Sequence, residues 1–113
     1  MREIRLAVPT QGEKGLEDTV SDIFCRAKTF TLVEISDGAV TDVKVIENPA
    51  SSYIQGAGPV VVKTLVDLKV NMVAAKEFGP GASTLLEQHN VIKVPVESDR
   101  VVDQVVKDIL KSI

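Results

Sequence analysis

The sequence predicts a single α/β domain in which one mixed sheet lies between two layers of helices. Two β-rich stretches separated by a tight-turn signal fill the first half, and short apolar runs alternate with amphipathic stretches in the second. The chain has 113 residues, of which 44% are hydrophobic and 26% charged, as in an ordinary globular domain. Since no linker, repeat or low-complexity stretch interrupts it, we expect residues 1–113 to form one domain.

Three strands are predicted in the first half. Ile4–Val8 is a short apolar-rich strand, and the polar residues 10–19 that follow indicate a loop. Thr29–Ile35 and Val40–Ile46 are rich in β-branched and apolar residues. Ser36-Asp37-Gly38 between them is typical of a tight turn, so these two strands should form a hairpin.

The second half alternates helices with strands. Residues 59–68, 82–89 and 102–113 carry apolar side chains at helical spacing, and Pro59 suits a first helical turn. Met72–Ala75 and Val91–Val94 are short apolar strands. The continuous run of Met72–Ala75 predicts a strand covered on both faces.

Some helix ends and faces also follow from the pattern. Asn90 occupies the position of a left-handed residue after the second helix, and Ser98 or Asp99 is suited to cap the third. His89 continues the apolar stripe of the second helix, so we expect it to be packed rather than to bind metal. The acidic residues at 13, 17, 18 and 22 are expected to form a solvated loop.

The element order is therefore β-β-β-α-β-α-β-α. Right-handed crossovers favour the strand order 3-2-1-4-5 with strand 2 antiparallel, in a three-layer α/β/α arrangement. This is the ribonuclease-H-like architecture. A metal-dependent nuclease needs carboxylates on the first strand, and Leu6-Ala7-Val8 supplies none.

Composition excludes several classes of protein. The net charge of -3 argues against a nucleic-acid partner, and no apolar run is long enough to cross a membrane. The N-terminus has no export signal, so the expected location is cytoplasmic. One histidine and one cysteine cannot build a closed zinc site from this chain alone.

The topology brings four segments to one edge of the sheet, around the crevice between strands 1 and 4. Glycines open two of the helices there, and helix N-termini attract anions. Arg26 could add a positive charge or pair with Glu17, Asp18 or Asp22. The expected ligand-binding residues are Thr10, Cys25, Arg26, Gln55, Gly56, Ala57, Gly58, Gly79 and Gly81.

Cys25 has two interpretations that the sequence leaves open. As a thiolate it would be a soft ligand for iron or copper, and Arg26 beside it would lower its pKa if it were exposed. As a small packed side chain it would be inert. The glycines likewise have an ordinary use in tight turns.

Five segments carry a resemblance to a known family. They are Leu6–Pro9, Val20–Phe30, Ile46–Pro49, Gly56–Pro59 and Gly79–Ala82. In their order and spacing they resemble the dinitrogenase iron–molybdenum cofactor biosynthesis family over nearly the whole chain. The resemblance implies the ribonuclease-H-like fold and a non-enzymatic carrier of an anionic iron–molybdenum, iron–sulfur or molybdenum–copper sulfide cluster. The family typically has histidine where this chain has Ile23, glycine at Cys25, and often a second histidine near Ile54-Gln55.

The first functional hypothesis is therefore a cluster carrier, with Cys25 as a candidate metal ligand and a protein donor or acceptor of the cluster as partner. The second is a binding or regulatory domain for a small phosphate or carboxylate. The third is an interaction module, monomeric or weakly homodimeric, which pairs through the predicted edge strand Val40–Ile46. An enzyme is disfavoured because the sequence shows no general-base constellation.

Overall fold

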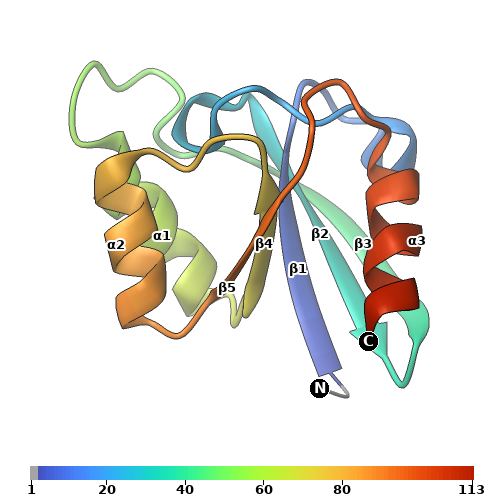
Figure 1. Cartoon of the computed structure of the whole chain (residues 1–113). Helices are drawn as coiled ribbons and strands as arrows, with labels where there is room; N and C mark the ends of the chain where they lie inside the picture. Colours follow the sequence, from blue (N-terminus) through green and yellow to red (C-terminus); the bar gives the residue numbers. More distant parts are fainter. Residues whose placement is uncertain (1–2) are drawn as a thin grey trace.

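The computed structural model describes residues 3–113 and shows helices on both faces of a central sheet (Figure 1). In chain order the elements are β1 (Glu3–Thr10), the 3-10 helices η1 (Gly15–Glu17) and η2 (Phe24–Arg26), β2 (Thr29–Ser36), β3 (Ala39–Glu47), α1 (Ala57–Asp67), β4 (Met72–Ala75), α2 (Pro80–Gln88), β5 (Ile92–Pro95) and α3 (Val102–Ser112). The predicted helices and strands are all present. The two 3-10 helices were not predicted: η1 lies within the expected loop 10–19, and η2 lies in the segment just before β2.

In this part of the chain five strands form one sheet in the order β3-β2-β1-β4-β5. β2 is antiparallel to β1 and β3, whereas β4 is parallel to β1 and β5. The predicted strand order and the antiparallel orientation of strand 2 are confirmed. α1 and α2 lie on one side of the sheet and α3 on the other (Figure 1).

The sheet separates two apolar clusters. One contains Ala7, Phe30 and Val73 with the inner faces of α1 and α2. The other contains Leu6 and Val33 with the inner face of α3. All four residues of β4 are buried, as the continuous apolar run predicted.

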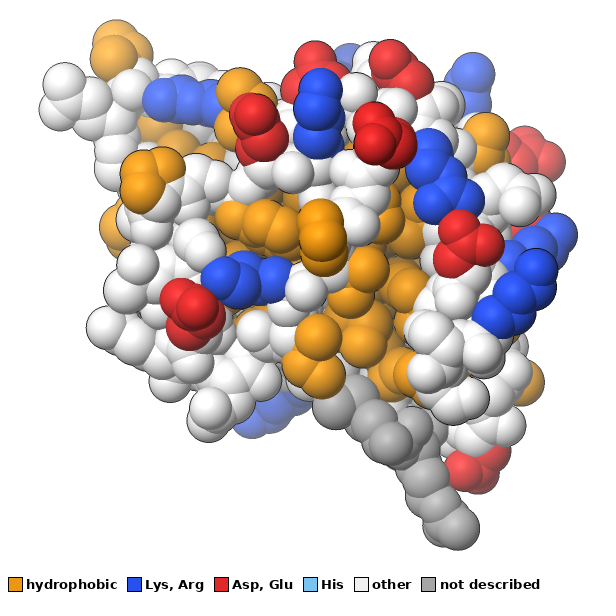
Figure 2. All heavy atoms as spheres, viewed as in Figure 1, with side chains coloured by type: hydrophobic (Ala, Val, Ile, Leu, Met, Phe, Trp, Pro, Cys, Tyr) orange, Lys and Arg blue, Asp and Glu red, His pale blue; other side chains and the backbone are white. Residues whose placement is uncertain are grey.

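α3 covers only part of its side of the sheet. Apolar side chains remain visible between α2 and α3 (Figure 2). Ile92 of β5, which pairs with buried Met72 of β4, is 40% exposed. The core is therefore closed most tightly around β1 and β4 and opens toward β5.

The predicted hairpin turn and the left-handed residue after α2 are confirmed. Asp37 and Gly38 have φ angles of 50° and 83°, which suit a tight two-residue turn, and Asn90 has a φ of 60°. The predicted cap of the third helix is wrong. α3 begins after Val101 without a side-chain cap, and the Asp99 carboxylate accepts a hydrogen bond from Gln11 Nε2 at 2.9 Å instead.

Two further expectations are corrected. Asp18 is buried rather than solvated, since its carboxylate accepts backbone N–H groups of the surrounding loop. His89 is exposed at the C-terminal end of α2 rather than packed in its apolar stripe. Among residues 3–113 no helix combines the length and apolar character needed to cross a bilayer.

Candidate functional site

The starts of α1 and α2 lie side by side at one end of the sheet. α1 follows Gly56 and α2 follows Gly79. A Cβ atom placed on Gly58 would lie 3.6 Å from the backbone nitrogen of Ala82 and 3.7 Å from the Sγ atom of Cys25. The two helix N-termini and the cysteine sulfur therefore meet around Gly58, and we call this place the glycine cradle.

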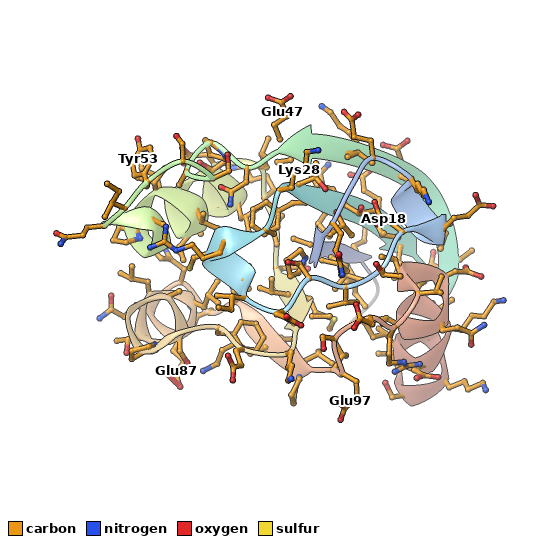
Figure 3. The ribbon with its side chains drawn as sticks, turned by 90° about the horizontal axis from the view of Figure 1, so that it is seen from above. Asp18, Lys28, Glu47, Tyr53, Glu87 and Glu97 are labelled. Atoms are coloured by element: carbon orange, nitrogen blue, oxygen red, sulfur yellow. The ribbon has the colours of Figure 1, made fainter. Side chains whose placement is uncertain are left out.

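The short helix η2 lies between the starts of α1 and α2, as the view from above shows (Figure 3). On the α2 side, the backbone N–H of Phe24 donates to the carbonyl of Glu77 at 3.0 Å. The Phe24 ring is fully buried and packs against Phe30 and Phe78, with centroids 5.5 and 5.8 Å away. These contacts hold η2 against the loop that leads into α2.

On the α1 side, two polar side chains attach η2 to the loop that precedes α1. Asn48 donates from Nδ2 to the carbonyls of Cys25 and Ala27, at 3.1 and 2.9 Å. The Arg26 guanidinium donates to the carbonyls of Tyr53 and Ile54. η2 therefore connects the two glycine-containing loops and sets their positions relative to each other.

The glycines leave both helix starts open. Gly56 and Gly79 have φ angles of 77° and 82°, where side chains are strained, and neither helix has a side-chain cap. Apart from the neighbouring residues in the chain and the backbone of the same helix, no heavy atom among the described residues lies within 4 Å of a Cβ built on Gly56, Gly79 or Gly81. The first N–H groups of a helix lack an acceptor in their own helix, so this end offers unpaired donors and partial positive charge.

Cys25 lies at the inner side of the cradle and is half-buried. Its Sγ atom lies 3.9 Å from the carbonyl oxygen of Phe78. Burial raises the pKa of this thiol above its usual value, and the positive charge of Arg26 lowers it by a smaller amount. The expectation that Arg26 lowers the pKa applied to an exposed thiol, whereas in the folded chain burial has the larger effect.

The remaining predicted site residues are placed differently. Thr10 is fully buried, and its hydroxyl lies 2.7 Å from that of Thr29 and 3.1 Å from that of Thr31, so the sheet interior satisfies it. Gln55 is exposed on the loop before α1. Arg26 binds backbone carbonyls rather than the acidic side chains considered from the sequence.

Few side chains at the cradle could bind a ligand or a metal ion. Within residues 3–113 no group of three or more His, Cys, Asp or Glu side chains is placed to hold a metal ion. The groups that meet at the cradle are backbone N–H donors, one sulfur, and the charge of Arg26. This chemistry suits an anion, or an anionic cluster to which Cys25 adds a metal–sulfur bond.

Sequence reasoning missed the part played by Asn48. The dipeptide Asn48-Pro49 indicated only the end of a strand, whereas the buried Asn48 side chain attaches η2 to the loop before α1. The one sequence feature that pointed to a role for Asn48 was its place in Ile46–Pro49, a segment that carries the family resemblance.

The fold and the cradle together define a class: a small ribonuclease-H-like α/β domain with two uncapped helix starts at one edge of its sheet. The sequence profile of the dinitrogenase iron-molybdenum cofactor family matches residues 3–112. The chain therefore belongs to that family, and the resemblance found in its motifs is confirmed. Membership relates it to iron–molybdenum cofactor-related binding.

The chain is also similar to individual proteins and solved structures. An uncharacterized protein from Methanocaldococcus jannaschii is 26% identical over 85 residues, which are 75% of this chain and 68% of that protein. The apo form of the orange protein from Desulfovibrio gigas superposes with a TM-score of 0.85 and 26% identity, covering 96% of this chain and 88% of that chain. A candidate NifB protein from Thermotoga has a TM-score of 0.74 and 31% identity, covering 99% and 89%.

Proposed function

We propose that the protein binds an anionic metal–sulfur cluster as cargo in the glycine cradle and acts as a carrier rather than as an enzyme. Family membership and the similarity to the orange protein and a candidate NifB protein support a cofactor-related ligand. The observation that carries the proposal is the meeting of two helix starts and the Cys25 sulfur around Gly58.

Hydrogen bonding and charge favour an anionic cargo at this place. The N–H groups of Gly58, Gly81 and Ala82 belong to first helical turns, where both helix dipoles present partial positive charge. Cluster sulfides accept hydrogen bonds from such donors. The charge of Arg26 acts at the same place, since it lowers the pKa of Cys25.

Cys25 would contribute a thiolate, which suits iron and copper better than oxygen ligands do. Because burial raises the pKa of this thiol, the incoming metal has to displace a proton. Cluster binding should therefore release a proton and strengthen as the pH rises. The sulfur is already half-buried, so a bound cluster would be partly shielded from water at that point.

We assign no catalytic step to this site. His89, the single histidine of the sequence, lies at the C-terminal end of α2, whereas the cradle lies at its start. A site made of backbone donors and one thiol can hold and release a cluster, so its partners would be the proteins that supply and accept it.

The decisive experiment is anaerobic incubation with iron–sulfide and with molybdenum–copper–sulfide species, followed by desalting and measurement of bound metal and sulfide. Stoichiometric retention is expected for the parent and for His89→Gln, a control at the far end of α2. Cys25→Ser should retain less metal. Absence of retained metal in the parent would refute the carrier function, and equal retention by Cys25→Ser would remove the thiolate from it.

The backbone donors have a separate test in Gly58→Ala. The added Cβ would make ordinary contacts at 3.6 to 3.7 Å, so the variant should fold, while the methyl group stands over the N–H of Ala82. Reduced retention with unchanged stability is expected. Full retention would show that the cluster does not use this part of the cradle.

A smaller oxyanion is the second candidate, because the cradle is made mainly of backbone donors that bind any anion. A phosphate or carboxylate ligand that binds only the folded state would raise the melting temperature with its concentration. Thermal stabilisation by phosphate compounds, together with no retained metal, would favour this regulatory role over the carrier.

A further inference from the structure

β3 forms an open edge of the sheet. It spans Ala39–Glu47 and pairs with β2 on one side, while the strand order ends at its other side. Most of its residues are exposed or half-buried, and Val40 is 38% exposed. Such an edge offers N–H and C=O groups to another strand, and nine residues are long for an unprotected edge.

Two charged residues at the middle of this edge lack ion-pair partners. Asp42 and Lys44 are both exposed, and within residues 3–113 neither forms a salt bridge. Asp42 is paired across the ladder with Glu34, whose carboxylate lies 2.7 Å from the Arg5 guanidinium. Two acidic residues directly opposite each other disfavour the pairing unless positive charge is near both. The Arg5 guanidinium forms its ion pair with Glu34, and among residues 3–113 none is found for Asp42.

We propose that β3 pairs antiparallel with β3 of a second copy, about a two-fold axis at Val43. This register sets Asp42 opposite the partner's Lys44 and, by symmetry, Lys44 opposite the partner's Asp42. Val43 then faces its own counterpart. Both unpaired charges of the edge obtain an opposite charge, and each Asp42 lies between Glu34 and a lysine.

The charges also select this register over its neighbours. Opposite residues in an antiparallel pair share a face of the sheet, so the two-fold axis has to pass through a residue position. With the axis at Asp42, two aspartates would stand opposite each other, and with the axis at Lys44, two lysines would. Both arrangements place like charges in direct cross-strand contact.

The local geometry limits the strength of the pairing. The β2–β3 register shifts between Glu34 and Ile35, so Thr41 is an extra residue on β3 and the regular edge begins at Asp42. Contact along one pair of edge strands buries less surface than a standard stable interface. The dimer should therefore form at high concentration and weaken with salt, as exposed ion pairs do. It uses neither helix start of the glycine cradle, so it stands apart from the proposed cargo function.

A charge-swap series tests the register by sedimentation equilibrium over a wide concentration range. The parent should associate to a dimer, and Asp42→Lys or Lys44→Asp should each raise the dissociation constant about tenfold or more, since two attractive pairs become repulsive. The double variant Asp42→Lys/Lys44→Asp has the composition of the parent and should restore the dimer. A parent that stays monomeric at millimolar concentration, or a double variant no tighter than the singles, overturns the proposal.

Cross-linking gives an independent measurement that does not depend on charge. In a Cys25→Ser background, Val43→Cys places two cysteines opposite each other at the axis, and mild oxidation should yield a covalent dimer. Val45→Cys is the matched control, because in this register it faces the partner's Thr41. Equal cross-linking of both variants, or pairing of β3 with a different protein's strand, contradicts self-association about Val43.

Discussion

All three helices begin at the same end of the sheet, but their starts differ in chemistry (Figure 1). α1 and α2 follow glycines and are open, whereas α3 follows Val101 and carries Asp103 in its first turn. The N–H of Val102 donates to the carbonyl of Asp18 at 2.9 Å. The α3 start is therefore occupied by its own chain. A helix start becomes a candidate anion site only where the fold leaves its donors open.

The loop beside the start of α3 is stabilised by one buried carboxylate (Figure 1). Asp18 accepts the backbone N–H groups of Gly12, Lys14 and Thr19 at 2.9, 3.1 and 2.8 Å. In the view from above, Asp18 lies on the α3 side and Tyr53 on the far α1 side, with η2 between them (Figure 3). The end of the sheet where the helices begin therefore has two halves. In the closed half, at the α3 start, Asp18 binds the loop backbone. In the open half, at the α1 and α2 starts, η2 lies between two uncapped helices.

The largest loss of stability is expected from removing the buried Phe24 ring, which packs η2 against the rest of the protein. Phe24→Ala deletes a fully buried ring and should lower the free energy of unfolding by about 3–5 kcal/mol, measured by urea denaturation. Phe78→Ala, which removes a half-buried neighbour of Phe24, should cost less. A loss below about 1 kcal/mol for Phe24→Ala would mean that η2 is not held by its ring.

Breaking the closed half should have the next largest effect. Asp18→Ala leaves three backbone N–H groups without their charged acceptor, and we expect a loss of about 2–3 kcal/mol. Exposed Asp22→Ala is the control and should change stability by no more than about 0.5 kcal/mol. Where Asp18→Ala is folded, it should retain ligand at the cradle as well as the parent does. If the folded variant lost ligand retention, the Asp18 loop and the glycine cradle would not be independent.

A smaller effect is expected from the strained glycine at the α2 start. Gly79 has φ 82° and ψ 149°, close to a region that only glycine occupies readily, so Gly79→Ala should cost about 1–3 kcal/mol. Gly81→Ala is the matched control, because its φ is not positive and its Cβ would meet open space. Thermal unfolding of the two variants compares them directly. Equal losses would show that backbone strain is not the reason for glycine at position 79.

The smallest effect is expected in the pH dependence of Cys25 alkylation. Because burial raises the pKa of Cys25, alkylation of the folded protein by iodoacetamide should reach half its maximal rate at a higher pH than alkylation in urea. Arg26→Gln removes the charge that lowers this pKa and should move the folded profile higher still. In the same sense, the thiol contributes to stability below its unfolded pKa, and that contribution is lost as the pH rises through the folded pKa. Superimposable profiles for folded and unfolded protein would contradict the effect of burial.

Much of the architecture could be predicted because local signals and chain connectivity agree. The apolar run of Met72–Ala75 predicts a central strand, and the hairpin and alternating βα units lead to the observed strand order. The glycines at both helix starts were likewise visible in the sequence. These features depend on periodicity and on conformations that few residues adopt, and both are local properties.

The chemistry of the candidate site depended on contacts between distant segments. Nothing near Arg26 in the chain indicates that it binds the carbonyls of Tyr53 and Ile54, or that Asn48 holds the backbone of Cys25. The burial of Asp18 and the exposure of His89 were missed for the same reason.

The sequence by itself therefore determined the fold class, the order of the strands and the glycine positions at the starts of α1 and α2. Only the tertiary structure decided which helix starts remain open, that the Cys25 sulfur meets them, and that burial outweighs Arg26 in setting its pKa. The physical reason is that hydrophobic periodicity acts along the chain, whereas desolvation and hydrogen-bond satisfaction depend on which segments pack together in space.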